Sequence, residues 1–301
     1  MPLLTISLLL IATQASDSTL QTRVEARIAK TPARAVGVYY RDLAGRDSLT
    51  VGAAARFHAA STMKVPVMIQ LFRDRDAGRL SLDDSLTVTN TFRSIVDSSP
   101  YQLDLTDDSD SSLYKRVGQR ISIRGLIELM ETVSSNLATN LLVTRVGAPR
   151  ANATARALGA DSILVLRGVE DGKAYRAGLN NTTTARDLGV LLAAIAENRA
   201  ASPGSCREML AILGRQQFNE GVPAGLPAGT RVYHKTGWID QVVYHDAALV
   251  DPAGGRRYVL VVLTGGIQKS DDAYALVRDL SRIVYESRTR DQSIRRTGGN
   301  Q

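Results

Sequence analysis

Apolar residues follow a helical period near the N-terminus and then switch to a strand pattern. Leu20, Val24 and Ile28 recur every four residues and predict an amphipathic helix over about 18–30. The stretches 35–40 and 48–51 are typical of two short strands joined by a turn. The chain therefore opens with a helix and a strand pair.

The middle of the chain returns to helical spacing. We expect a helix from about Ser61 to Ala77, a second behind a Ser122 cap, others over 137–146, 149–158 and 205–217, and one that begins behind a Thr184 cap. Residues 90–119 break the pattern because they are rich in aspartate and serine. They predict a long loop, or an insertion that covers a site.

Strand periodicity resumes after residue 230. Residues 231–236, 244–250 and 258–263 predict three strands, and an amphipathic helix follows. The fold class is therefore α+β: an antiparallel five-stranded sheet built from both chain ends, flanked by terminal helices, with an inserted all-helical lobe. The predicted lobes are 19–60 with 220–288 (α/β) and 61–219 (helical), followed by a polar tail at 289–301.

Composition is that of an ordinary globular protein and narrows the function only slightly. The chain has 301 residues and a formal net charge of +7, but its basic residues are scattered, so we do not expect nucleic-acid binding. The single cysteine, Cys206, excludes an intramolecular disulfide. Nothing in the pattern requires an oligomer, and we expect a monomer.

The N-terminus is typical of an export signal. An apolar run from Leu3 to Ala12 is followed by small and polar residues, which predicts a signal peptide over 1–15, although no basic residue precedes Arg23. The run is too short to cross a membrane as a helix. We therefore expect a periplasmic or secreted protein with no membrane span in the mature chain.

Candidate chemistry begins at Ser61-Thr62-Met63-Lys64, which precedes an apolar run. On a helix, Ser61 and Lys64 share one face, and a lysine with a lowered pKa can act as base for a serine nucleophile. A second Ser-x-x-Lys at Ser112 lies in a polar stretch and is interpreted as a solvated loop.

Two further motifs could supply partners. Ser134-Ser135-Asn136 falls between two predicted helices, where it could relay a proton and hold a substrate carbonyl, or simply cap a helix. Lys235-Thr236-Gly237 ends a predicted strand and could bind a substrate carboxylate, or form a turn.

Other hydrolase chemistries fit poorly. The three histidines, His58, His234 and His245, accompany no Gly-x-Ser-x-Gly elbow, so we interpret them as structural or supporting residues. No clustered set of zinc ligands and no nucleotide-binding glycine loop is present in the sequence. We expect no metal and no cofactor.

Taken together and in this order, the three motifs resemble those of the class A serine β-lactamases and penicillin-binding proteins. The resemblance covers about residues 19–288. It implies Ser61 as the acylated nucleophile, Lys64 as its base, Ser134 as proton relay and Asn136 as a ligand of the substrate amide. By the same resemblance Lys235, Thr236 and Gly237 would bind the substrate carboxylate.

The resemblance also implies an oxyanion hole from the backbone N–H groups of Ser61 and Trp238, and a glutamate that activates the deacylating water. Glu170 is the candidate glutamate, although the family's asparagine four residues later is Ala174 here. Trp238 stands where small residues are usual and would narrow the cleft. Glu170 could instead be a surface loop carboxylate.

The predicted function is therefore a β-lactam hydrolase that works through a Ser61 acyl-enzyme, acting on a small β-lactam or a D-Ala-D-Ala-like peptide. Two alternatives stay open. One is a D-alanyl-D-alanine peptidase or another amidase or esterase of the same fold. The other is a penicillin-binding sensor that is acylated without turnover.

Overall fold

A computed structural model describes residues 20–45 and 47–297. The predicted signal peptide at 1–15 lies outside the described residues. Within the described part, no helix is both long enough and apolar enough to cross a membrane.

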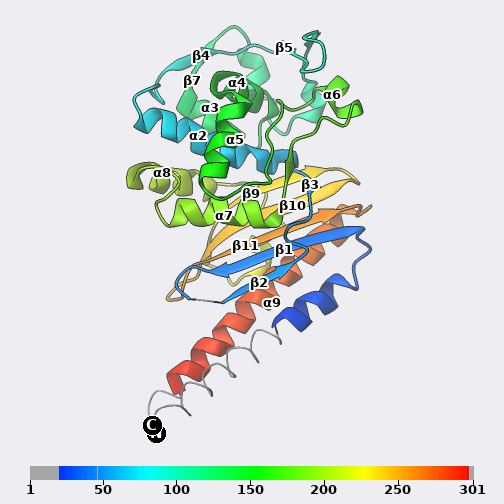
Figure 1. Cartoon of the computed structure of the whole chain (residues 1–301), viewed down its shortest axis with the longest axis vertical. Helices are drawn as coiled ribbons and strands as arrows, with labels where there is room; N and C mark the ends of the chain where they lie inside the picture. Colours follow the sequence, from blue (N-terminus) through cyan, green and yellow to red (C-terminus); the bar gives the residue numbers. More distant parts are fainter. Residues whose placement is uncertain (1–19, 46, 298–301) are drawn as a thin grey trace.

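The centre of the fold is an antiparallel sheet of five strands in the order β2-β1-β11-β10-β9 (Figure 1). The strands are β1 (Ala35–Asp42), β2 (Ser48–Val51), β9 (Arg231–Ile239), β10 (Val243–Asp251) and β11 (Tyr258–Gly265). β1 lies against β11, with Ala35 opposite Gly265, so the sheet joins both ends of the chain. The predicted five-stranded antiparallel sheet is confirmed.

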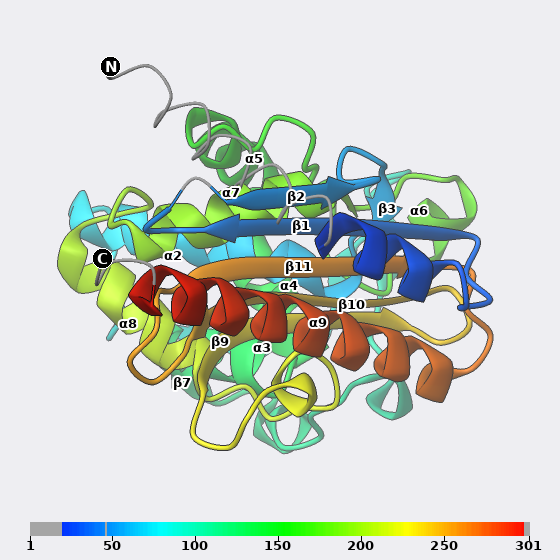
Figure 2. The same cartoon turned by 90° about the horizontal axis from the view of Figure 1, so that it is seen from below.

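Two terminal helices cover one face of the sheet. Figure 2 shows the N-terminal helix, residues 20–28, beside the long helix α9 (Ser270–Thr297). Leu20 and Val24 share a buried apolar cluster with Leu276 and Leu280 of α9 and with the sheet residues beneath them. The predicted flanking helices are therefore present, and their apolar stripes contribute to the smaller of two buried apolar clusters.

Helix α7 (Ala185–Ala196) covers the opposite face (Figure 1). Thr184 caps it by accepting a hydrogen bond from the backbone N–H of Asp187 (3.0 Å). Gly189 lies against β1, where a Cβ atom would come within 2.2 Å of the Tyr39 ring. A glycine at this position therefore lets α7 lie close to the sheet.

The helical layer lies beyond α7. It contains α2 (Lys64–Asp76), α3 (Ile123–Thr132), α4 (Asn136–Val146), α5 (Ala148–Ala157), α6 (Gly172–Arg176) and α8 (Pro203–Leu213). Because α7 belongs to the predicted helical lobe yet packs on the sheet, the two layers share this helix. The exact lobe boundaries stay a prediction.

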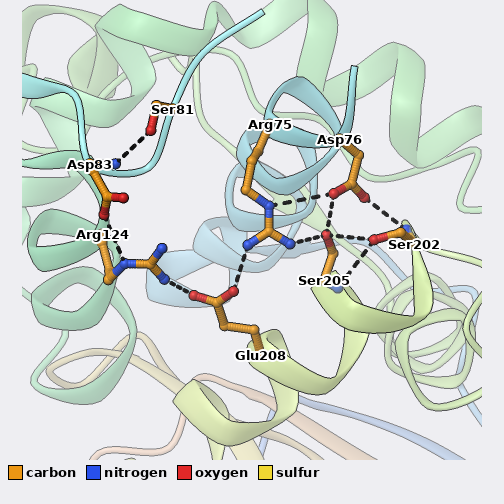
Figure 3. Close-up of polar contacts among 8 residues, drawn as sticks. All are labelled: Arg75, Asp76, Ser81, Asp83, Arg124, Ser202, Ser205 and Glu208. Carbon is orange, nitrogen blue, oxygen red and sulfur yellow. Dashed lines mark hydrogen bonds and ion pairs between the residues drawn. The ribbon is translucent and has the colours of Figure 1, made fainter. Parts of the chain in front are cut away.

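Polar contacts fix the C-terminal end of α2 (Figure 3). Arg75 donates to Glu208 of α8 (2.5 Å) and also to Ser205, while Asp76 accepts a hydrogen bond from the Ser205 hydroxyl (2.5 Å). Glu208 in turn pairs with Arg124 of α3. This network joins three helices and sets the direction of α2, whose other end carries Lys64.

The segment predicted as a long loop, 90–119, contains several short elements. These and the remaining short elements are β3 (Phe57–His58), β4 (Ser85–Thr87), β5 (Phe92–Arg93), β6 (Pro100–Tyr101), β7 (Arg120–Ser122), β8 (Thr182–Thr183), η2 (Leu105–Asp107), η3 (Leu113–Arg116) and η4 (Pro223–Gly225). Asp108, in this segment, accepts hydrogen bonds from the N–H groups of Asn136 and Leu137 (2.9 Å each). The segment thus caps α4.

The predicted polar tail at 289–301 needs a correction, because α9 continues to Thr297. Arginine favours helices, and the local sequence holds no glycine or proline before Gly298. Arg288, at the start of this arginine-rich end, is buried and donates to the Tyr40 hydroxyl (2.6 Å) and the Arg256 carbonyl (2.7 Å).

Candidate active site

Ser61 lies in a 3₁₀ turn, η1 (Ala60–Met63), directly before α2. The preceding residue, Ala60, has φ +45°, and its N–H donates to Nδ1 of His58 (3.0 Å). That bond leaves the proton of the neutral His58 ring on Nε2, and burial lowers the pKa of His58 to about 4. A strained residue and a neutral imidazole therefore hold the turn that presents Ser61.

Lys64 is the first residue of α2 and is fully buried. Its Nζ donates to the Ser134 carbonyl (2.7 Å), to Ser134 Oγ (3.0 Å) and to Asn136 Oδ1 (3.2 Å). Burial, followed by the positive charge of Lys235, holds the pKa of Lys64 well below its usual range. A lowered pKa makes the neutral form of Lys64, which can accept a proton, easier to populate.

Ser134 is the residue on which the three motifs converge. It joins α3 to α4 with φ +59°, a conformation that few non-glycine residues adopt. Lys235 Nζ, also fully buried, reaches Ser134 Oγ at 3.0 Å from the side opposite to the helical layer. One hydroxyl therefore bridges two buried amines, one from α2 and one from β9.

The Lys-Thr-Gly motif lies on β9 against η1. The Thr236 hydroxyl is buried, and Oγ1 has no hydrogen-bond partner within the described residues. At Gly237 a Cβ atom would lie 2.9 Å from the Ser61 nitrogen and 3.0 Å from the Thr62 nitrogen. A glycine thus lets the strand touch the turn that carries Ser61, as the close-approach argument predicts.

Hydrogen bonds from Arg167 join the two ends of the loop that carries Glu170. Arg167 donates to the Leu179 carbonyl and to Asn180 Oδ1 (2.9 Å each). Further along, Asn140 of α4 accepts from Val169 N (2.6 Å) and donates to Val169 O (3.0 Å). This pair of bonds fixes the backbone directly before Glu170.

Glu170 points into the site. Its Oε1 accepts from Asn136 Nδ2 (2.8 Å) and its Oε2 from the N–H of Asp104 (3.2 Å), and its φ is +60°. Burial raises the pKa of the carboxyl. Because Asn136 also contacts Lys64, one amide joins the Glu170 carboxylate to the buried lysine. The alternative interpretation, a surface loop carboxylate, does not account for these two contacts, and the catalytic role of Glu170 stays a prediction.

A cleft of about 550 Å³ opens beside these groups. The candidate residues in its wall are Ser61, Asn136, Glu170 and Trp238, and supporting residues in the wall include His58, Arg167 and Tyr175. The Trp238 indole packs edge-to-face on Phe218, with ring centroids 4.9 Å apart. No group of three or more His, Cys, Asp or Glu residues in the described chain could hold a metal ion.

The other two histidines support the sheet. His234 Nδ1 lies 2.9 Å from Asp246 Oδ1, and His245 Nε2 lies 2.9 Å from the His58 carbonyl. Burial lowers the pKa of His245 to about 4, so the ring stays neutral.

Three residues of the site were missed from the sequence: Asn140, Asp108 and Glu131. Asn140 and Asp108 act on backbone groups, and no local pattern marks such a role. Glu131 is fully buried at the end of α3 and interacts with the charges of both Lys64 and Lys235. Its position four residues after the buried Ile127 would have placed it on the inner face of the helix.

Solved structures share this architecture. PBP-A is 30% identical, with a TM-score of 0.76 over 89% of this chain and 95% of that one. A β-lactamase from Sphaerobacter thermophilus is 27% identical, with a TM-score of 0.76 over 90% and 97% of the two chains. The TLA-1 extended-spectrum β-lactamase is 21% identical, with a TM-score of 0.78 over 90% and 99%, and shows the fold.

A comparison with curated proteins gave no significant match. The family comparison is clear, since the model described as "Beta-lactamase enzyme family" matches residues 19–287, nearly the whole described chain. The chain therefore belongs to the β-lactamase enzyme family, a family of serine β-lactamase-like hydrolases.

Proposed function

We propose that the chain is a class A-like β-lactam hydrolase that works through a Ser61 acyl-enzyme. The observation that carries the proposal is the bridge at Ser134, whose Oγ lies 3.0 Å from the Nζ atoms of both Lys64 and Lys235. A hydroxyl between a candidate base and a candidate anion-binding cation can pass a proton to a leaving nitrogen. An exported monomer remains part of the proposal and rests on the sequence.

Acylation would use the neutral form of Lys64. Its amine takes the Ser61 proton, Ser61 Oγ bonds to the lactam carbonyl carbon, and the oxyanion faces the N–H groups of Ser61 and Trp238. The C–N bond then breaks as Ser134 gives its proton to nitrogen and regains one from Lys64.

Substrate binding would fall to the β9 motif. The Lys235 cation and the unpartnered Thr236 hydroxyl can hold a carboxylate, and the close approach at Gly237 aligns that edge with Ser61. Asn136 can orient the substrate amide from the other side of the cleft.

Hydrolysis of the ester would require a base for water, and Glu170 is the candidate. Its carboxylate reaches the Lys64–Asn136 pair and is held from two sides. Water that loses a proton to this carboxylate attacks the ester carbonyl, and Ser61 leaves with its proton restored.

One observation favours a second candidate, a peptidase or penicillin-binding protein that hydrolyses lactams poorly. Asn140 clamps Val169, not Glu170, and the Glu170 carboxylate is already engaged by Asn136 and Asp104. PBP-A, at 30% identity, has been solved as an acyl-enzyme with penicillin G in a variant form. In this candidate the acyl-enzyme forms normally and is long-lived.

Intact-mass spectrometry with a chromogenic β-lactam separates the candidates. The wild type, Glu170→Gln and Glu220→Gln, an exposed carboxylate outside the cleft wall, are compared. We expect turnover by the wild type and the control, and an adduct on Ser61 that accumulates in Glu170→Gln. A stable adduct on all three would establish the second candidate. Absence of both adduct and turnover would overturn the lactam proposal.

A further inference from the structure

Glu131 is an unpaired buried carboxylate. It lies in the last turn of α3 and has no exposed surface, and neither Oε1 nor Oε2 has a hydrogen-bond partner in the part of the chain that the structure describes. Only its backbone is bonded, since its carbonyl accepts from Gln216 Nε2 (2.7 Å). A carboxylate without such partners is costly to bury unless nearby charges compensate it.

The charges that face it are cations from two other elements. Lys235 of β9 and Lys64 of α2 both act on Glu131, and both reach Ser134 Oγ, three residues beyond it. Lys64 also faces Asp108 and Glu170. The charge of Asp246 on β10 also acts on Lys235, although Asp246 is the register partner of the neighbouring residue Thr236.

The pair is unusual among the lysines of the chain. The four others, Lys30, Lys115, Lys173 and Lys269, are exposed, whereas Lys64 and Lys235 have no exposed surface. Two buried amines next to each other disfavour their charged forms, and a buried anion beside them opposes that effect.

We propose that Glu131 is a positioning residue, the buried counter-ion that sets the protonation states of Lys64 and Lys235 and so the pH range of acylation. The kinetic part of this inference rests on the proposed function, whereas the part about charge does not. Nothing in the family motifs contains this residue, because it lies three positions before Ser134.

The direction of the effect follows from charge. Burial raises the pKa of Glu131 to about 7, so the carboxyl is an anion from about neutral pH upward. There the Glu131 anion favours the charged form of both lysines, so its removal lowers both of their pKa values. Lys64 then becomes a free base at lower pH, while Lys235 loses its positive charge at lower pH. The whole pH profile of acylation therefore moves toward acid.

The first test needs no substrate. Protein labelled with ¹³C at the lysine ε position is titrated by NMR as wild type, Glu131→Gln, Glu131→Asp and Glu128→Gln. Glu128 is a matched control, because it lies one turn earlier on α3 and pairs at the surface with Arg215. We expect the two buried lysines to titrate about one to three pH units lower in Glu131→Gln, and less so in Glu131→Asp. The control should match the wild type.

The second test is the pH profile of acylation by a carboxylate-bearing penicillin. In Glu131→Gln the acid limb of the pH profile of acylation should move to lower pH. KM should rise selectively above neutral pH, where Lys235 has lost its charge. A variant that merely loosens packing would lower kcat at every pH without this shift. Thermal unfolding verifies that each variant is folded. If Glu131→Gln does not fold, the pH profile of Glu131→Asp is measured in its place.

The outcomes separate the two proposals. Lysine titrations that coincide in wild type and Glu131→Gln would overturn the counter-ion. Shifted titrations in a protein that no β-lactam acylates would support the counter-ion and refute the lactam hydrolase. Shifts in both experiments would support both.

Discussion

Three residues in or next to the cleft adopt a positive φ, which residues with a side chain disfavour. Ala60, Ser134 and Glu170 have φ values of +45°, +59° and +60°, half of the six non-glycine residues with positive φ in the described chain. Such conformations cost about 1–3 kcal/mol each, so neighbouring contacts must hold them in place. Strain is thus concentrated where Ser61, Lys64 and the loop carboxylate meet.

Thr236→Val tests the role of the unpartnered hydroxyl. Valine has nearly the same shape, and no hydrogen bond within the described residues is lost, so stability should not fall. A hydrogen bond to a substrate carboxylate is worth about 1.5–3 kcal/mol, so KM should rise about tenfold or more. Steady-state kinetics and thermal unfolding measure the two effects.

An unchanged KM in Thr236→Val would show that the hydroxyl does not contact the substrate. Thr230→Val, at a half-exposed position before β9, is the control and should change neither KM nor thermal stability.

The site residues that could be predicted from the sequence belong to short motifs with an uncommon spacing, each placed at the end of a predicted helix or strand. Lys64 and Lys235 both bond to Ser134, and Ser61 lies in the turn directly before Lys64. The catalytic roles of these four residues stay predictions. Glu131 could not be interpreted as functional, because a single glutamate near a helix end is commonly solvated. What distinguishes it is burial beside two cations, and these come from segments far away in the sequence.

Among the elements, the segment 90–119 has the clearest consequence for the site. Asp108 accepts hydrogen bonds from the first N–H groups of α4, the helix that carries Asn136. A carboxylate there also complements the positive end of the helix dipole. The segment 90–119 thereby helps to position the Asn136 amide, which we propose contacts the substrate.

Asp108→Ala should lower the free energy of unfolding by about 1–2 kcal/mol, because it removes a cap from α4. Asp108→Asn keeps an acceptor and should lose less. Urea unfolding measures both, with Asp97→Ala as a control, since Asp97 forms only an exposed contact with Lys173 and with its own turn. Equal stability of Asp108→Ala and the wild type would contradict the capping role.

Elements with their own periodicity were predictable. The strands β9, β10 and β11 appear close to their expected bounds, and the helices α3 and α7 begin behind the expected caps Ser122 and Thr184. The segment 90–119 was not predictable in detail, since its strands β5 and β6 are only two residues long and show no periodicity, and its Asp108 caps another element. The sequence analysis did not predict the extension of α9 past Arg288, because the cluster of arginines suggested a solvated chain end.

For the whole molecule, Arg288 joins the two chain ends. It pairs with Asp42 of β1 (3.0 Å), donates to the Tyr40 hydroxyl and stacks over Tyr258 (4.5 Å). Asp42 has no exposed surface. Without Arg288 its buried charge would keep one cation, Arg256, and the backbone N–H groups of Ala44 and Gly45 as partners.

Arg288→Met should therefore destabilise the protein by about 3 kcal/mol, as measured by urea unfolding. Arg282→Met is the matched control on α9, because its half-exposed pair with Asp279 is worth less than about 1 kcal/mol. A loss in Arg288→Met no larger than in the control would show that α9 is not anchored there.

The pairing of β1 with β11 has a consequence for how the protein is made. Ser61 and Lys64 leave the ribosome early, but Lys235 and the strand that supports the Ser61 turn arrive only with the last third of the chain. A nascent or truncated chain that lacks this part has neither the completed sheet nor the second amine at Ser134. Under the proposed function, acylation by a lactam would thus report the completion of synthesis and folding, and a labelled penicillin would distinguish finished molecules from fragments.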